Sequence, residues 1–263
     1  FRDGAIPQIL GQPEARGAAA EMLRLAGPYL ADLVPNTRTR DIEPYAAPAE
    51  VQGILRAAGI RALAIAITID PTVRFSFAAT NPPTLVLARS VATSATAIDW
   101  RFIAGRAAAL VNAGGTAIEH LGPRSVEEIL QLICKLCASD VDIVGVDPGR
   151  VAHFLKRLKS AIPRAVRKQI APFAEAYVSA VEPTSSSAFA FARHATANRV
   201  GLALAGDLTS ALNIIARLER SVTQLSSESD ERRTLLLANE ALADLVKFAG
   251  SPDGLELLRS RRA

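Results

Sequence analysis

Residues 61–88, RALAIAITIDPTVRFSFAATNPPTLVLA, differ in pattern from the rest of the sequence. They contain three apolar runs: 61–70 is rich in isoleucine, 73–79 alternates with a period of two, and 84–88 is almost wholly aliphatic. Asp70-Pro71 and Asn81-Pro82-Pro83 separate the runs and are typical of turns. The stretch therefore predicts a small three-stranded sheet, in what is the only β-rich region of the sequence.

Helical patterns lie on both sides of this sheet. Before it, 14–33 predicts a helix interrupted at Gly27-Pro28, and 48–58 predicts a second helix closed by Gly59, joined by a polar connection over 37–45. After it, Ser125 and Glu128 form a capping-box pattern, Asp147-Pro148 is a helix start, and Gly206-Asp207 is a helix stop followed by a cap. The later predicted helices span 99–113, 125–138, 148 onward, 163–180, 185–205, 207–220 and 231–249, the last capped by Asp230 after a polar loop over 221–230.

The sequence therefore predicts an α+β protein that is predominantly helical, with the small sheet followed by a helical bundle. We expect residues 1–59 to form N-terminal helices that could end a preceding helical region. We expect residues 60–263 to form one domain.

Composition narrows the class of protein. The 263 residues are 49% hydrophobic and 21% charged, which excludes collagen-like, disordered and disulfide-scaffold proteins. No apolar run approaches the roughly 18 residues needed to cross a membrane, and no secretory signal is evident, so a cytoplasmic location is expected. The first residue is Phe1, which suggests a fragment of a larger chain.

Few motifs carry chemistry. Cys134 and Cys137 form a CxxC pattern, but it lies inside a predicted helix and lacks a second ligand pair, so we expect structural cysteines. His120, His153 and His194 are far apart in sequence and form no ligand pair. The sequence contains no G-x-S-x-G, phosphate-binding lysine loop or G-x-G-x-x-G motif. We therefore predict neither a metal nor a cofactor.

Three sequence segments nevertheless occur in a recognisable order: PTLVLARS at 83–90, DWRFIAGR at 99–106, and ATANR at 195–199 followed by AGD at 205–207. With the predicted strands, they make residues 60–114 and 185–220 resemble the gluzincin metallopeptidases of the CAAX-prenyl-protease and heat-shock membrane-protease type. The resemblance implies a zincin-like scaffold, in which a small sheet precedes a helix carrying H-E-x-x-H. A later helix of that family supplies the third zinc ligand.

The diagnostic residues of that family are replaced here. By position, Arg106 stands for the first ligand histidine, Ala107 for the catalytic glutamate and Leu110 for the second histidine. Thr196 stands for the ligand glutamate and Asn198 for a following aspartate. Catalytic zinc needs about three protein ligands and a base, so the resemblance implies an inactive pseudopeptidase without zinc.

Such a domain would act as a protein-interaction or assembly module, and its partner would be another protein or another part of its parent chain. A lost site of this kind would bring Arg106 close to Asn198 and Arg199, and a buried Arg106 would need an acceptor such as the Asn198 amide oxygen.

The sequence leaves other interpretations open. The chain could be an unrelated helical domain with a three-stranded sheet, or an enzyme that uses unrecognised residues. Its net charge of +4 also allows a basic module that binds nucleic acid or another acidic partner. Such a module would use the basic segment 156–168, which contains Lys156, Arg157, Lys159, Arg164, Arg167 and Lys168. A solvated helix face explains this group, and the basic residues Arg38 and Arg40, without any ligand.

Overall fold

The computed structural model describes residues 9–31, 33–34, 41–78, 80, 82–138, 141, 143, 147–180, 185–218, 230–231, 234 and 238–260. Helices hold 68% of these residues, and a four-stranded mixed sheet lies near the N-terminus. The predicted class, a mostly helical α+β protein, is confirmed. No helix in these ranges combines the length and the apolar character needed to cross a membrane.

The sheet has the order β1-β2-β4-β3. β2 and β4 are parallel, with Ile65 opposite Leu85, while β1 and β3 run antiparallel to them at the two edges. The three strands predicted within residues 61–88 are confirmed, but the predicted number of strands for the whole sheet is wrong. The strands are β1 (Ile42–Pro44), β2 (Ala64–Thr68), β3 (Phe75–Ala78) and β4 (Thr84–Ala88).

The additional strand, β1, lies in the segment predicted as a polar connection. It has three residues, and its last residue is a proline, which cannot donate a ladder hydrogen bond and is found at sheet edges. A strand this short has no alternating pattern, so its pairing with β2 is a tertiary effect.

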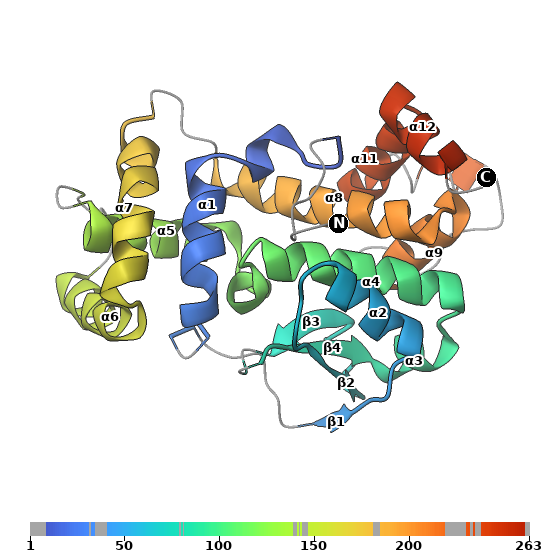
Figure 1. Ribbon diagram of the computed structural model, residues 1–263, viewed down its shortest axis with the longest axis horizontal. Helices are drawn as coiled ribbons and strands as arrows, with labels where there is room; N and C mark the ends of the chain where they lie inside the picture. The colour runs from blue at the N-terminus through green and yellow to red at the C-terminus, as the bar shows by residue number, and fades with distance from the viewer. Residues whose placement is uncertain are drawn as a thin grey trace.

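Two central helices, α4 (Ala97–Asn112) and α8 (Ser186–Ala205), run side by side next to the sheet (Figure 1). Small residues bring them together: a Cβ atom added at Gly201 would lie 2.8 Å from the ring of Phe102, and one at Gly105 would lie 3.0 Å from the carbonyl oxygen of Val200. Both helices are buried on most of their circumference. They therefore form the middle layer of the molecule.

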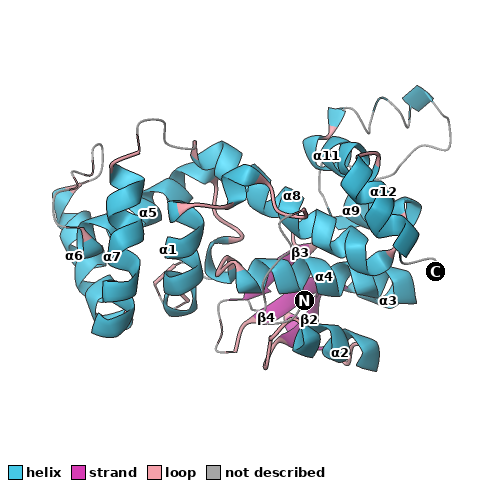
Figure 2. Ribbon diagram, turned by 45° about the horizontal axis from the view of Figure 1, so that its top comes forward, coloured by secondary structure: helices cyan, strands magenta, loops and turns pink. Residues whose placement is uncertain are grey.

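The buried apolar residues divide into two hydrophobic clusters, and α8 runs from one to the other (Figure 2). The sheet lobe contains the sheet, most of α4, the second half of α8, α2 (Ala49–Ala57), α3 (Arg89–Ser94), α9 (Leu208–Leu218), α11 (Glu240–Ala249) and α12 (Pro252–Ser260). The helical lobe contains α1 (Ala18–Ala26), α5 (Pro123–Cys137), α6 (Pro148–Ala161), α7 (Arg164–Val178) and the start of α8. Residues 9–59 contribute to both lobes, and their assignment to a preceding region stays a prediction.

Several helix ends agree with the sequence. Gly206 ends α8 in the left-handed conformation, with φ of 71°, and Asp207 accepts a hydrogen bond from the backbone N–H of Ser210. Asp147 caps α6 in the same way through the N–H of Arg150. The helix predicted over 14–33 is α1, flanked by the short turns η2 (Pro13–Ala15) and η3 (Gly27–Tyr29), so the interruption at Gly27-Pro28 is confirmed.

Other helix ends differ. The capping box predicted at Ser125 is wrong, because α5 already begins at Pro123, which leaves Ser125 inside the first turn. The capping box occurs instead at Thr96 and Asp99, at the start of α4. The single helix predicted over 231–249 is also wrong, because Asn239 interrupts it and caps α11. Arg38, Arg40 and most of the predicted loop at 221–230 lie outside the described residues.

Candidate functional site

A buried polar group lies where α4 and α8 meet, and we call it the inner cluster. The exposed fraction is 3% for Arg106, 5% for Arg193 and 0% for Asn198. The Glu119 side chain, just after the short turn η4 (Thr116–Ile118), is also 5% exposed, whereas His194 is 32% exposed. Polar side chains this deeply buried need partners, because desolvation without a hydrogen bond is costly.

Arg106 has three kinds of contact. Its Nη1 donates a hydrogen bond to Oδ1 of Asn198, with a separation of 2.5 Å. Its guanidinium carbon lies 4.8 Å from the ring centroid of Phe75 on β3, within the range of a cation–π interaction. Its Nη2 lies 3.5 Å from Nδ1 of His194. The arginine therefore joins the sheet to both central helices.

Arg193 and Glu119 complete the cluster. Nη2 of Arg193 donates to the carbonyl oxygen of Gly115 at 3.4 Å and lies 3.5 Å from Oε2 of Glu119, whose Oε1 is 3.5 Å from Nδ1 of His194. Burial lowers the pKa of Arg193, while the neighbouring Glu119 carboxylate opposes that shift. Because arginine stays charged in proteins, the cluster places two cations against one carboxylate.

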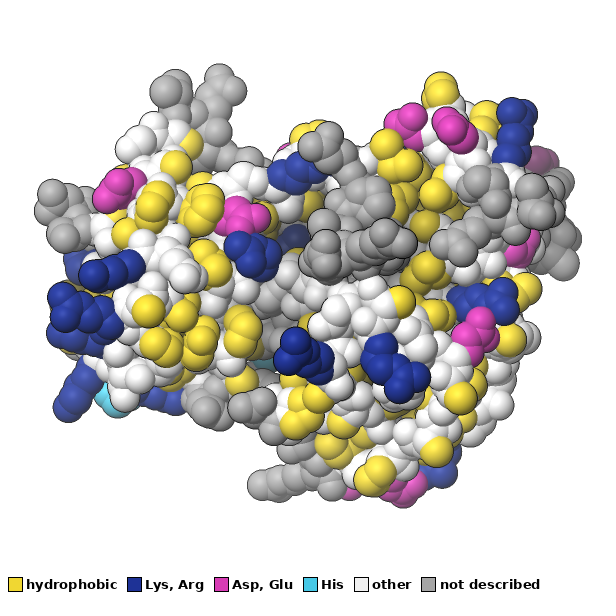
Figure 3. Space-filling view, in the orientation of Figure 1, with side chains coloured by type: hydrophobic (Ala, Val, Ile, Leu, Met, Phe, Trp, Pro, Cys, Tyr) yellow, Lys and Arg dark blue, Asp and Glu magenta, His cyan; other side chains and the backbone are white. Residues whose placement is uncertain are grey.

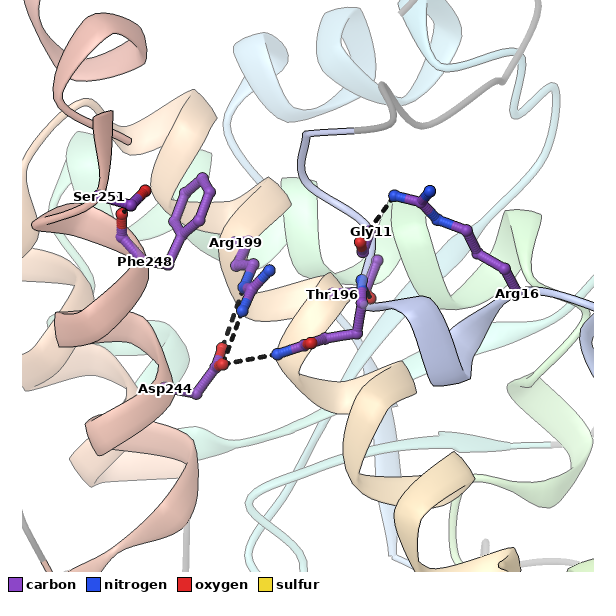
Figure 4. A network of polar contacts seen from close by, with 8 residues as sticks. Gly11, Arg16, Thr196, Arg199, Asp244, Phe248 and Ser251 are labelled. Carbon is purple, nitrogen blue, oxygen red and sulfur yellow. Dashed lines mark hydrogen bonds and ion pairs between the residues drawn. The ribbon is translucent and has the colours of Figure 1, made fainter. Parts of the chain in front are cut away.

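A second polar group, the outer cluster, joins α8, α11 and the segment around Gln12 (Figure 4). Asp244 of α11 accepts two hydrogen bonds from Arg199, at 3.1 Å from Nε and 2.7 Å from Nη2, and a third from Nε2 of Gln12 at 2.6 Å. The backbone N–H of Gln12 donates to Oγ1 of Thr196 at 2.9 Å. Arg199 also lies 4.8 Å from the ring centroid of Phe248. Through Gln12, the outer cluster therefore links the N-terminal segment, residues 9–17, to α8 and α11 by hydrogen bonds.

Helical geometry explains how the residues of α8 divide between the two clusters. Successive residues are about 100° apart, so residues four apart share a face while neighbours do not. His194 and Asn198 face α4, whereas Thr196 and Arg199 face the N-terminal segment and α11.

The structure thus brings Arg106 together with Asn198 and places Thr196 and Arg199 elsewhere. The remaining positions predicted from the sequence, Ala107 and Leu110, are buried in the sheet lobe.

The sequence interpretation missed Glu119 and Arg193. Their contact joins residues 74 positions apart, and no local motif indicates it. His194 also belongs to the cluster, and its spacing from Asn198 was a usable signal: residues four apart lie on one helix face.

The chemistry of the inner cluster does not favour a metal. It offers one imidazole and one carboxylate, and both lie beside arginines. Within the described ranges, no group of three or more histidine, cysteine or acidic side chains is arranged to hold an ion.

The cysteine pair lies apart from both clusters, at the end of α5 in the helical lobe. Sγ of Cys134 is 3.7 Å from the sulfur of Met22. Burial raises the pKa of Cys134 to about 12, with a further rise from Cys137. Burial also raises the pKa of Cys137 to about 11, although Arg167 opposes that shift. Thiols with raised pKa values are protonated at neutral pH, which makes them weak nucleophiles.

Comparison with known proteins adds no family assignment: no protein-family model matches the chain, and neither curated proteins nor solved structures gave a match.

Proposed function

We propose that this chain is a catalytically inactive, metallopeptidase-like domain that works as a protein-interaction or assembly module. It would bind another protein or another part of its parent chain. The observation that supports this proposal is the placement of Arg106. Its cationic side chain is buried between α4 and α8 and donates to Asn198, at the helix position where the resemblance calls for a zinc-binding histidine.

The chemistry of hydrolysis argues against activity at this place. A zinc peptidase needs about three ligands, an open coordination position and a carboxylate base. Ala107 has no carboxylate, and the permanent positive charges of Arg106 and Arg193 oppose the binding of a divalent cation. The same contacts suit a different role, because they fix two central helices in one arrangement. A fixed scaffold of this kind presents constant surfaces to a partner.

The test is to measure zinc and peptidase activity together. The untagged chain is incubated with excess zinc, desalted and analysed for bound metal, and it is assayed with labelled casein. We expect far less than one zinc per chain and no hydrolysis above the level of buffer.

His194→Ala and Glu119→Gln provide the matched variants, because these residues hold the two potential ligands of the inner cluster. Stoichiometric zinc that is lost in both variants, or casein cleavage that a chelator abolishes, would show that the proposal is wrong.

A further inference from the structure

The net charge of the chain is concentrated in one helical pair. Residues 147–178, which form α6 and α7, hold seven of the 30 lysines and arginines but only two of the 26 acidic residues. The rest of the chain holds 23 basic and 24 acidic residues, so it is close to neutral. Figure 3 shows blue side chains gathered at the end of the molecule formed by α6. The helical lobe therefore has a local positive field, which attracts acidic partners.

An apolar pocket opens beside this basic surface. It has a volume of about 220 Å³ and lies between α5 and α6. Its walls are mainly aliphatic and aromatic, including Ile129 and Leu132 from α5 and Val151 and Phe154 from α6. One charge of each sign, Arg150 and Glu128, and the exposed Ser125 also line it. A pocket of this kind accepts a bulky apolar side chain.

The pocket and the basic face adjoin each other on α6. Arg150, His153 and Arg157 are three and four residues apart, so they share one face of the helix. That face lies next to Phe154, and all three side chains are exposed. Among the described residues, the side chain of Arg150 has no carboxylate partner within the molecule. A ligand in the pocket would therefore lie against this positive face.

We propose that the α5–α6 pocket and the adjoining face of α6 bind an acidic segment of a partner protein. One leucine, isoleucine or phenylalanine of the segment enters the pocket, and its carboxylates lie against Arg150 and Arg157. This inference rests on the proposed interaction function and names its surface and partner chemistry.

Two observations favour a protein segment over nucleic acid. The pocket walls match an aliphatic or aromatic side chain, and phosphate binding would make no use of them. Phe154, Phe173 and Tyr177 of α6 and α7 are all half-buried, so these two helices present no exposed phenylalanine, tyrosine or tryptophan ring on which bases would stack.

The test begins with a displayed library of random peptides of about 12 residues, panned against the whole chain. We expect the enriched peptides to combine acidic residues with one large apolar residue. Two variants then distinguish the contribution of the basic face to peptide binding from that of the pocket. Arg150→Glu with Arg157→Glu reverses the charge, and Ser125→Trp fills the pocket from an exposed position.

Each variant should weaken the binding of enriched peptides about tenfold or more. Arg56→Glu with Arg61→Glu is the matched control, because it makes the same charge change at exposed positions of the sheet lobe and should leave binding unchanged. Melting temperatures of all variants confirm that each one folds.

Two results would overturn the inference. One is enrichment without an acidic and apolar pattern, or peptide binding that survives both variants. The other is binding of a DNA duplex of about 20 base pairs, or of phosphatidylserine vesicles, in preference to the enriched peptides, with loss on charge reversal but not in Ser125→Trp. The zinc assay is independent of this outcome, so the inactive-domain proposal and the peptide site fail separately.

Discussion

Arg106 illustrates how a buried charge acts at the scale of one residue. A guanidinium removed from water loses hydration, and it is tolerated only where hydrogen bonds and ring contacts replace that loss. Asn198 supplies an oxygen and Phe75 a ring face. Removal of the arginine would leave the Asn198 oxygen without this donor in a site from which water is excluded.

We therefore expect Arg106→Met to lower the free energy of unfolding by about 2–4 kcal/mol, measured by denaturant titration. Arg101→Met is the control on the same helix, because Arg101 pairs with Glu50 at the surface, where both side chains are more than 40% exposed. Loss of a surface pair costs about 1 kcal/mol or less. Equal effects of the two substitutions would show that Arg106 has no special structural role.

The two cysteines give a second prediction at this scale. Cysteine thiols of an unfolded chain have a pKa of about 8.5. In the folded protein, burial raises the pKa of Cys134 to about 12 and that of Cys137 to about 11. At pH 8 both thiols should therefore be protonated in the folded protein and should react slowly with iodoacetamide. The reaction should become much faster in guanidinium chloride, as mass spectrometry would show.

The sign of the linkage follows from the same values. The folded pKa values exceed the unfolded ones, so thiol protonation stabilises the folded state below about pH 9. This contribution is lost as the pH rises through about 11 to 12. A thiol that reacted rapidly at pH 8 in the folded chain would contradict the burial argument.

How far the site could be predicted from the sequence also depends on single residues. The contact between Arg106 and Asn198 was anticipated because two recognisable sequence segments carry these residues. Arg199 follows Asn198 directly, and the rotation of about 100° per residue turns it toward Asp244 instead. Glu119 could not be anticipated, since its neighbours in the cluster are set by tertiary packing alone.

At the scale of elements, the close packing of α4 and α8 depends on glycine. Gly105 and Gly201 do not have positive φ, so glycine is needed at these positions for space and not for backbone conformation. A methyl group at Gly201 would press on the ring of Phe102, which is fully buried and cannot move aside. Overpacking of this kind forces shifts in a dense core.

We expect Gly201→Ala to lower stability by about 1–3 kcal/mol despite the better helix propensity of alanine. Gly53→Ala in α2 is the matched control, because no atom would lie within 4 Å of the added Cβ. That substitution should raise stability by about 0.5–1 kcal/mol. Thermal unfolding of both variants tests the pair, and a stabilising Gly201→Ala would show that the helices can separate freely.

Elements with strong local signals could be predicted from the sequence. β2, β3 and β4 follow from three apolar runs that proline-containing turns separate, and the end of α8 follows from Gly206-Asp207. β1 could not, since it has only three residues. The sequence interpretation ended its last helix at residue 249 and missed α12, although Ser251-Pro252 is a helix-start pattern in which the Ser251 hydroxyl accepts a hydrogen bond from the backbone N–H of Gly254. The false capping box at Ser125 arose because an earlier proline had already opened the helix.

At the scale of the whole molecule, α8 connects the two hydrophobic clusters. Phe189 near its start is buried in the helical lobe, and Leu202 near its end is buried in the sheet lobe. Between them lies the inner cluster, whose buried charges would meet water if either lobe opened. A single uninterrupted helix of 20 residues thus makes the stability of each lobe depend on the other.

We therefore expect one cooperative unfolding transition in differential scanning calorimetry, with equal calorimetric and van't Hoff enthalpies. Phe189→Ala and Leu202→Ala should each cost about 2–5 kcal/mol, because each leaves a cavity in a different cluster. Both should lower the temperature of the same transition instead of splitting it. Two resolved transitions, with each variant moving only its own, would show that the lobes unfold independently and that α8 breaks between them.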